Sequence, residues 1–236
     1  MSDVTYNAGN MTITISGMDD VKNALGDLKS KTPAAAKVAI NATAREARKL
    51  MIAQAKARYA VNAAGQKHLK ELVQRKKATN TSLNAELHIS SFRNDLGYFT
   101  YNPKETYTGW RVIYNAPEFV TAKVLKASAM RPLTGSASPR LSKGFAVKFS
   151  SGHVGIVQRV IGSNSSHKVT KNGVPRWTTS DGRVEKLWTM GSPSATAMHN
   201  TIWPVVEPSV EAYLRERIDT QVAKILARAA ARKAKK

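Results

Sequence analysis

Ten alanines lie between Ala34 and Ala57, and this run of small side chains constrains the fold more than any other feature of the sequence. Thr32 is a suitable N-cap, and Pro33 is favoured at the first position of a helix. The sequence therefore predicts a helix from Thr32 and Pro33 to about Tyr59. A helix with so many alanines lets a neighbouring backbone approach closely.

The same helix carries basic residues at intervals along its length: Arg45, Arg48, Lys49, Lys56 and Arg58. One interpretation is the solvated face of a core helix. The other is a helix that recognises nucleic acid. The first is the commoner use of such a pattern, and we favour it.

Alternation of apolar and polar residues predicts several strands. Residues 11–15 read as a short strand, and residues 73–79 and 83–90 as a hairpin. The clearest hairpin signal is at 145–149 and 154–160, which frame a Ser-Ser-Gly-His turn. Further strands are expected at residues 96–101 and 110–114, and a long loop at residues 116–143.

Apolar residues at helical spacing predict a short helix at residues 18–30 and a long C-terminal helix at residues 208–228. We take Glu207-Pro208 as the start of the long helix. Its apolar face is Val210, Leu214, Ile218, Val222 and Ile225. Residues 61–65 read as a break, and residues 68–73 as a helical turn.

These elements predict an α+β fold, with an N-terminal strand and helices, an antiparallel sheet with hairpins, and a long C-terminal helix. We expect one domain over residues 1–236. Loop or arm insertions are expected near residues 116–143 and 162–200. A basic tail at 229–236 is expected to fray or lie free.

The charge is strongly unbalanced, with 37 Lys and Arg against 16 Asp and Glu, a net charge of +21. Such a surplus repels itself in a compact chain, and a polyanion or an acidic partner would relieve it. Bases concentrate at residues 45–77 and 121–187, and after Asp219 there are six bases and no acid. Solubility alone is the other explanation for this charge.

The chain has no cysteine, which excludes disulfides and thiolate chemistry. Residues 1–10 lack the pattern of a signal peptide, and no apolar run is long enough to span a bilayer. We therefore expect synthesis in the cytoplasm and no membrane contact.

Familiar enzyme motifs are missing. The five histidines are not spaced as metal ligands, and neither a phosphate-binding glycine loop nor a Gly-x-Ser-x-Gly elbow occurs. Ser150, Ser151 and His153 suggest a hydrolase, but a hairpin turn is the simpler interpretation. We expect no enzyme activity, no metal and no cofactor.

A non-specific nucleic-acid-binding protein remains an alternative, because aromatic side chains between bases can stack on nucleotides. The candidates are Trp110, Tyr114, Trp177, Trp188 and Trp203. Such side chains are more often core or interface anchors.

The order of the elements resembles a known family. Ile15-Ser-Gly-Met-Asp-Asp-Val precedes the alanine-rich helix Pro33-Ala-Ala-Ala-Lys-Val-Ala. Phe145-Ala-Val-Lys-Phe-Ser-Ser-Gly-His-Val-Gly and the helix start Glu207-Pro-Ser-Val follow. Together they resemble the minor tail protein Z family of tailed bacteriophages and prophages, the tail completion proteins.

The resemblance implies a non-enzymatic virion protein at the head-proximal end of the tail, in the neck region. Such a protein makes the tail competent to join the head, and it is expected as a ring, a hexamer to match the tail tube. The implied partners are the tail terminator, the tail tube and the head-completion or neck proteins, with non-specific contact to DNA.

Two sets of residues are candidates for contacts. The positions that best match the family pattern, and are therefore expected at an interface, are Ser151, Gly152, His153, Gly155 and Arg159. The basic residues expected to face DNA or a partner are Arg45, Arg48, Lys49, Arg75, Lys76, Lys77, Arg232, Lys233, Lys235 and Lys236.

Overall fold

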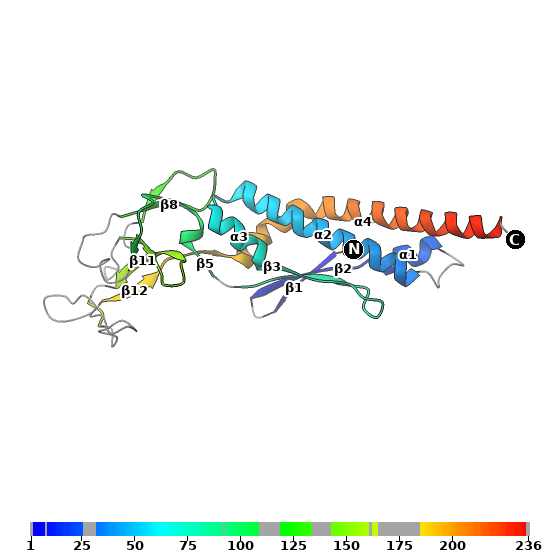
Figure 1. Ribbon diagram of the computed structural model, residues 1–236, viewed down its shortest axis with the longest axis horizontal. Coiled ribbons are helices and arrows are strands. Elements are labelled where there is room, and N and C mark those ends of the chain that lie inside the picture. Colours follow the sequence, from blue (N-terminus) through cyan, green and yellow to red (C-terminus); the bar gives the residue numbers. More distant parts are fainter. Residues whose placement is uncertain are drawn as a thin grey trace. The chain divides into compact units, whose positions relative to one another are not determined.

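The structure is a computed structural model that describes residues 2–7, 9–25, 32–91, 93–108, 119–133, 143–160, 162–164 and 185–234 (Figure 1). The chain divides into two compact units. Unit 1 comprises residues 1–55, 69–92 and 194–236, and unit 2 comprises residues 56–68 and 93–193. The single domain expected from the sequence stays a prediction.

Unit 1 contains a four-stranded antiparallel sheet in the order β1-β2-β4-β3. Its strands are β1 (Ser2–Asn7), β2 (Asn10–Ile15), β3 (Val73–Lys76) and β4 (Ala85–Ile89). Met11, Ile13 and Ile15 of β2 are buried, and their neighbours on the strand are not, as the alternation predicts. The hairpin β3–β4 is confirmed, whereas β1 was not predicted.

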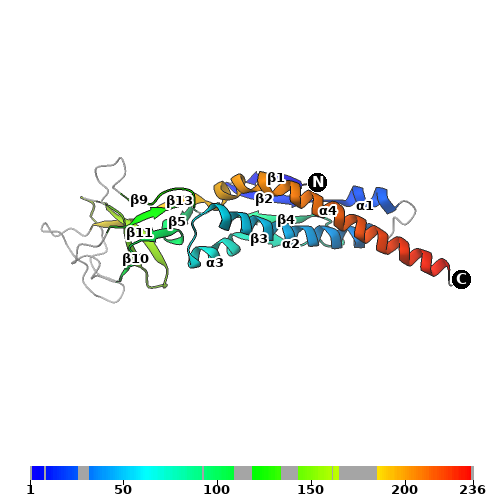
Figure 2. The same cartoon turned by 90° about the horizontal axis from the view of Figure 1, so that it is seen from above.

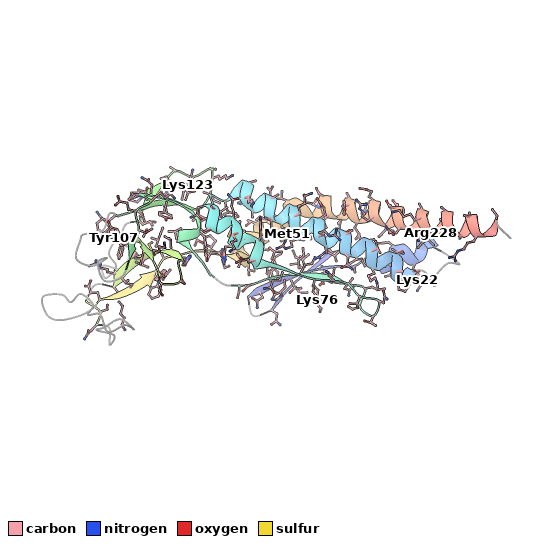
Figure 3. The ribbon with its side chains drawn as sticks, in the orientation of Figure 1. Lys22, Met51, Lys76, Tyr107, Lys123 and Arg228 are labelled. Carbon is pink, nitrogen blue, oxygen red and sulfur yellow. The ribbon has the colours of Figure 1, made fainter. Side chains whose placement is uncertain are left out.

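Helix α2 (Thr32–Arg58) confirms the prediction from the alanine run. Six of its buried residues are alanines: Ala35, Ala36, Ala39, Ala44, Ala47 and Ala55. Both views show α2 lying along the sheet of unit 1 (Figures 1 and 2). Met51, labelled in Figure 3, is fully buried on the same helix.

The C-terminal helix α4 (Ala195–Lys233) begins much earlier than Glu207-Pro208, so the predicted start is wrong. Ser194 is the N-cap, and its Oγ accepts a hydrogen bond from the Ala197 amide at 3.1 Å. Pro204 and Pro208 lie inside the helix and are exposed. The helix continues into the predicted basic tail as far as Lys233, and residues 235–236 lie outside the described residues, so the expected fraying of this tail stays a prediction.

Burial explains why the helix tolerates two prolines. Met198, Ile202 and Val206 are buried at intervals of four residues, and the predicted face follows in the same spacing. On that face Val210, Leu214, Ile218 and Val222 are buried, and Ile225 is half-buried. Contacts of α4 with β2 and β4 offset the cost of each proline, about 3 kcal/mol.

The short helices differ from prediction in their limits. Helix α1 (Met18–Leu25) confirms the first part of the predicted 18–30 helix, and residues 26–30 lie outside the described residues. Helix α3 (Ala63–Leu72) starts inside the predicted break at 61–65 and is longer than the predicted turn at 68–73. The Asn62 side chain begins it by accepting the Gly65 amide at 2.9 Å.

Unit 2 is built mainly of short strands. Its larger sheet has the order β12-β11-β10-β7. The members are β7 (Tyr107–Thr108), β10 (Phe145–Lys148), β11 (Val154–Val160) and β12 (Lys186–Thr189). The predicted hairpin is confirmed as β10–β11, with Phe145 opposite Val157. Phe145, Val147 and Val157 form its buried centre.

Two smaller sheets correct the predictions for the middle of the chain. One is β6 (Thr100–Asn102), β8 (Thr121–Lys123) and β9 (Arg131–Pro132), so the expected loop at 116–143 contains two strands. The other pairs β5 (Arg93–Asp95) with β13 (Gly191–Ser194). The predicted strand at 96–101 begins instead with a 3-10 turn, η2 (Leu96–Tyr98), which Asp95 caps.

Some predictions fall on residues that the structure does not describe, namely the strand at 110–114 and residues 165–184 of the insertion expected near 162–200. In the described part of the chain, no helix is both long enough and apolar enough to cross a membrane. The α+β class with antiparallel hairpins and a long C-terminal helix is confirmed.

Candidate functional site

A basic cleft of about 750 Å³ lies in unit 1 between α2, the end of α3 and β3. Its charged lining is five bases and two acids: Arg45, Arg48, Lys49, Lys70, Arg75, Glu46 and Glu71. The structure therefore brings together four of the predicted basic residues, Arg45, Arg48, Lys49 and Arg75. Lys70 joins them from the last turn of α3 and was not predicted.

Arg48 has a structural role in the cleft. Its Nε donates to the carbonyl of Val73 at 2.8 Å, and its second guanidinium nitrogen donates to the carbonyl of Lys70. These carbonyls lie where α3 ends and β3 begins, so a cation there also interacts favourably with the helix dipole. Arg48 thus fixes the connection from α3 to β3 as well as lining the cleft.

Arg75 is bound in a similar way. Its guanidinium donates to the carbonyl of Asn41 on α2 at 3.3 Å. The Asn41 side chain in turn donates to the carbonyl of Ala78 and accepts the Ala78 amide, both at 3.0 Å. This end of β3 is therefore held against α2, and the wall of the cleft is a fixed surface.

The other predicted bases on this unit are more exposed. Lys49 pairs with Glu46 and Lys76 with Glu86, each at 3.0 Å, and such surface pairs contribute little to stability. Arg45 and Lys77 are exposed and make no ion pair with any described residue. Arg45, and Lys70 with it, are therefore the cleft residues best placed to meet an anion.

The predicted C-terminal bases are only partly described. Arg232 is exposed on the last turn of α4. Lys233 ends the helix, and its side chain is outside the description, as are Lys235 and Lys236. Arg232 is not among the described residues that line the basic cleft.

The predicted interface residues of unit 2 lie on the β10–β11 hairpin. Ser151 and Gly152 are exposed in its turn, and Gly152 has a positive φ of 81°. The Gly152 amide donates to the carbonyl of Phe149 at 2.9 Å, and the Phe149 amide donates to that of His153 at 2.8 Å. This confirms the turn that the Ser-Ser-Gly-His sequence predicts.

His153 leaves the turn and binds Asp95, a residue that the sequence reasoning missed. Its Nε2 lies 2.8 Å from Asp95 Oδ2. Asp95 Oδ1 accepts the amide of Gly97 at 2.8 Å and that of Ile156 at 3.4 Å. Because an ionised carboxylate only accepts hydrogen bonds, His153 Nε2 carries the proton between them.

Gly155 allows this approach. A Cβ atom at this position would lie 2.6 Å from Asp95 Oδ2 and 2.6 Å from Phe149 Cε2. Both distances are far below an ordinary van der Waals contact. A methyl group at this position would therefore force the Asp95 carboxylate and the Phe149 ring to move, which gives a physical reason for Gly155 in the hairpin.

Aromatic rings surround the pair. The His153 ring lies 4.8 Å from Tyr98 and 6.0 Å from Phe149, measured between ring centroids. The Tyr98 ring also stacks on the His68 ring, with 4.1 Å between their centroids. His68 Nε2 lies 3.2 Å from Asn94 Oδ1, and the Asn94 amide donates to the carbonyl of Pro193 at 3.0 Å. The cluster connects α3, β5, η2 and the hairpin within unit 2.

Arg159, the last of the predicted interface residues, is half-buried on β11. Its guanidinium lies 5.6 Å from the centre of the Phe145 ring. Burial lowers the pKa of Arg159, and the charge of Glu185 opposes this shift. Arg159 is thus part of the packing of this sheet as well as of its surface.

The geometry of the hairpin does not form a nucleophile and base. The Ser151 oxygen contacts the backbone amide of His153 at 3.5 Å, and the His153 ring is engaged with Asp95. A serine nucleophile needs its hydroxyl on the imidazole. Among the described residues, no cluster of three metal-ligand side chains occurs.

The aromatic residues considered for base stacking have different positions. Trp203 is buried on α4 and therefore belongs to the core. Trp188 is 58% exposed on β12, where Leu187 is also exposed. Trp110, Tyr114 and Trp177 lie outside the described residues.

Comparisons of the chain with family models, with curated proteins and with solved structures gave no match.

Proposed function

We propose that the chain is a structural, non-enzymatic virion protein that completes the head-proximal end of a phage tail and enables joining to the head. It works in the neck as a ring, a hexamer, around the DNA path. Its partners are further copies of itself, the tail terminator, the tail tube and the head-completion proteins.

The basic cleft of unit 1 is the observation that carries this proposal. Five bases line it against two acids, and Arg45 is exposed at its rim. Attraction between such a surface and phosphate does not depend on base sequence. A protein that surrounds passing DNA needs this kind of contact.

Exposed apolar side chains on the edge strand β12 support assembly with other proteins. All four residues of β12 are exposed, and Leu187 and Trp188 are among them. An edge strand also leaves one row of backbone groups free to pair. Apolar and aromatic groups in such positions are common anchors of protein interfaces.

The experiment is complementation of tails assembled without this protein. Adding the purified protein should produce tails that join heads, and electron microscopy should show a ring at the head-proximal end. An Arg45→Glu variant should lower joining, whereas Asp3→Asn on the exposed part of β1 should not. Tails that join heads equally well without the protein would refute the proposal.

A second candidate is a non-specific nucleic-acid-binding protein, which the same cleft favours. It should bind duplex DNA alone, with an affinity that falls steeply as salt rises. Tight binding to DNA, together with no effect on tails, would favour this second function.

A further inference from the structure

The last turns of α4 carry an apolar stripe that described residues do not bury. The buried face of the helix ends at Val222, and no described side chain after it is buried. Ile225 and Ala229 are half-buried and Leu226 is 46% exposed, all in register with Val222. At about 1.5 Å per residue, this part of the helix extends roughly 16 Å from Ala223.

A basic stripe runs beside the apolar one. Lys224, Arg228 and Arg232 follow at intervals of four residues, and all are exposed; Arg228 is labelled in Figure 3. No acid follows Asp219 in the sequence, so this segment has no ion pairs of its own. Like charges four residues apart destabilise a helix by about 0.2–0.5 kcal/mol per pair. An acidic partner would reverse that effect.

A surface with complementary features lies on the same unit. A cleft of about 490 Å³ separates α1 from α4, whose neighbouring positions both views show (Figures 1 and 2). Leu214 and Ile218 form its floor and are each only 4% exposed, and Ala24 is the exposed apolar residue of its lining. Its charged lining is three acids and one base: Asp20, Glu211, Asp219 and Arg215.

The end of α4 cannot occupy the cleft of its own chain. Asp219 lines the cleft, and from there the helix is continuous to Lys233. A continuous helix leads each later residue away from the cleft, because the chain has no bend with which to return. An α4 end that fills this cleft therefore belongs to another molecule.

We infer that the end of α4 (residues 223–233) docks into the α1–α4 cleft of a second copy of this chain. The apolar stripe lies on Ala24 and on the floor that Leu214 and Ile218 of that copy form, and Lys224, Arg228 and Arg232 face its acids. The two surfaces differ, so the contact is heterologous and can close into a ring. The inference rests on the ring in the proposed function and names its contact.

Charge and hydrophobicity together favour this occupant. Two α4 ends placed against each other would bring their basic stripes together, which opposes a symmetric pairing of the helices. DNA would satisfy the bases but leave Ile225 and Leu226 in water. A second copy of the cleft meets both requirements.

The test is a charge exchange between the two surfaces. One variant carries Arg228→Glu and Arg232→Glu, and the other carries Asp20→Lys and Asp219→Lys. Sedimentation velocity over a concentration series should show self-association of the wild type, weakened about tenfold or more in each variant. An equimolar mixture of the two variants should associate within about threefold of the wild type, because each helix end then meets a cleft of opposite charge.

Two further variants separate this contact from general effects of charge and folding. Lys126→Glu with Lys148→Glu makes the same change in net charge as the helix variant at exposed positions of unit 2 and should leave self-association unchanged. Leu226→Gln should weaken association without changing charge. Circular dichroism establishes that each variant keeps the helix content of the wild type.

Several results would overturn the inference. These are a wild type that stays monomeric at high concentration, unchanged association in both exchange variants, or variants that do not recover when mixed. Loss of DNA binding in the helix variant with unchanged self-association would assign the helix end to nucleic acid. If the exchange variants still form rings and their tails still join heads, only the proposed contact is wrong. If rings form by this contact but do not change the joining of tails to heads, only the proposed function is wrong.

Discussion

The imidazole of His153 and the carboxylate of Asp95 meet at 2.8 Å although the two residues are 58 positions apart in the sequence. Asp95 caps the 3-10 turn and accepts two backbone amides, and His153 ends the turn of the β10–β11 hairpin. This pair therefore links two elements of unit 2 through one partly buried hydrogen bond. It gives the first prediction.

Asp95→Asn should lower the free energy of unfolding by about 1–3 kcal/mol, because the partners of a partly buried carboxylate lose a charged acceptor. Urea denaturation measures this loss. The double variant with His153→Phe should lose less than the sum of the two single variants. Additive losses would mean that the pair does not act as a unit, and Asp3→Asn on exposed β1 is the control.

Gly155→Ala should destabilise unit 2 strongly, by about 2 kcal/mol or more, because its Cβ would lie 2.6 Å from Asp95 Oδ2 and from Phe149 Cε2. Gly152→Asn is the matched control, since Gly152 has open space around it and Asn tolerates a positive φ. It should cost much less. Thermal unfolding compares the two, and equal losses would contradict the packing described for Gly155.

Arg48 and Arg45 lie on one helix and line one cleft, but they should respond differently to substitution. Arg48→Met removes donors to the carbonyls of Val73 and Lys70 and should cost about 1.5–3 kcal/mol of stability. Arg45→Met should leave stability nearly unchanged and weaken binding to DNA. Urea denaturation and a DNA titration at two salt concentrations test both, and the reverse pattern would refute these roles.

His199 should make stability depend on pH. Its side chain is fully buried on α4, and neither ring nitrogen has a hydrogen-bond partner among the residues that the structure describes. Burial lowers its pKa from 6.5 to about 4. Below pH 6.5 the His199 imidazole therefore binds a proton in the unfolded chain, whereas in the folded chain it stays neutral until the pH falls to about 4. Stability should be complete above that pH and fall by roughly 3 kcal/mol as the pH approaches 4.

His199→Leu should remove this part of the pH dependence, whereas Met198→Leu, a buried neighbour that does not titrate, should retain it. Urea denaturation of the three proteins between pH 4 and 7.5 gives the comparison. A slope in His199→Leu equal to that of the wild type would assign the pH dependence to other groups.

Local patterns predicted those elements whose signals lie within a few residues. The alanine run set the limits of α2 to within one residue of its end, and the Ser-Ser-Gly-His turn located β10–β11. The prediction of where α4 starts was wrong because Pro208 is a strong local signal for the start of a helix. The interval of four that connects Met198, Ile202 and Val206 to Val210 was the better signal, since it reports burial over the whole helix.

The candidate site was predictable only in part, for a similar reason. Basic residues were visible as a group, but the sequence does not tell which of them bind carbonyls, as Arg48 and Arg75 do. Asp95 was missed because its partner is distant in the sequence. Asp95 followed by Gly97 was the available signal, since such an aspartate often caps a turn.

The connectivity of unit 1 has a consequence for how the protein is made. The apolar face of β2 and β4 is complete early in synthesis, but α4, which contacts both strands, is encoded last. About 100 residues must be translated between β4 and the start of α4. At the usual speed of a ribosome this takes roughly 5–20 s, during which β2 and β4 lack their contacts with α4. The nascent chain therefore offers an apolar sheet to chaperones, and unit 1 completes its folding only when the C-terminal helix has left the ribosome.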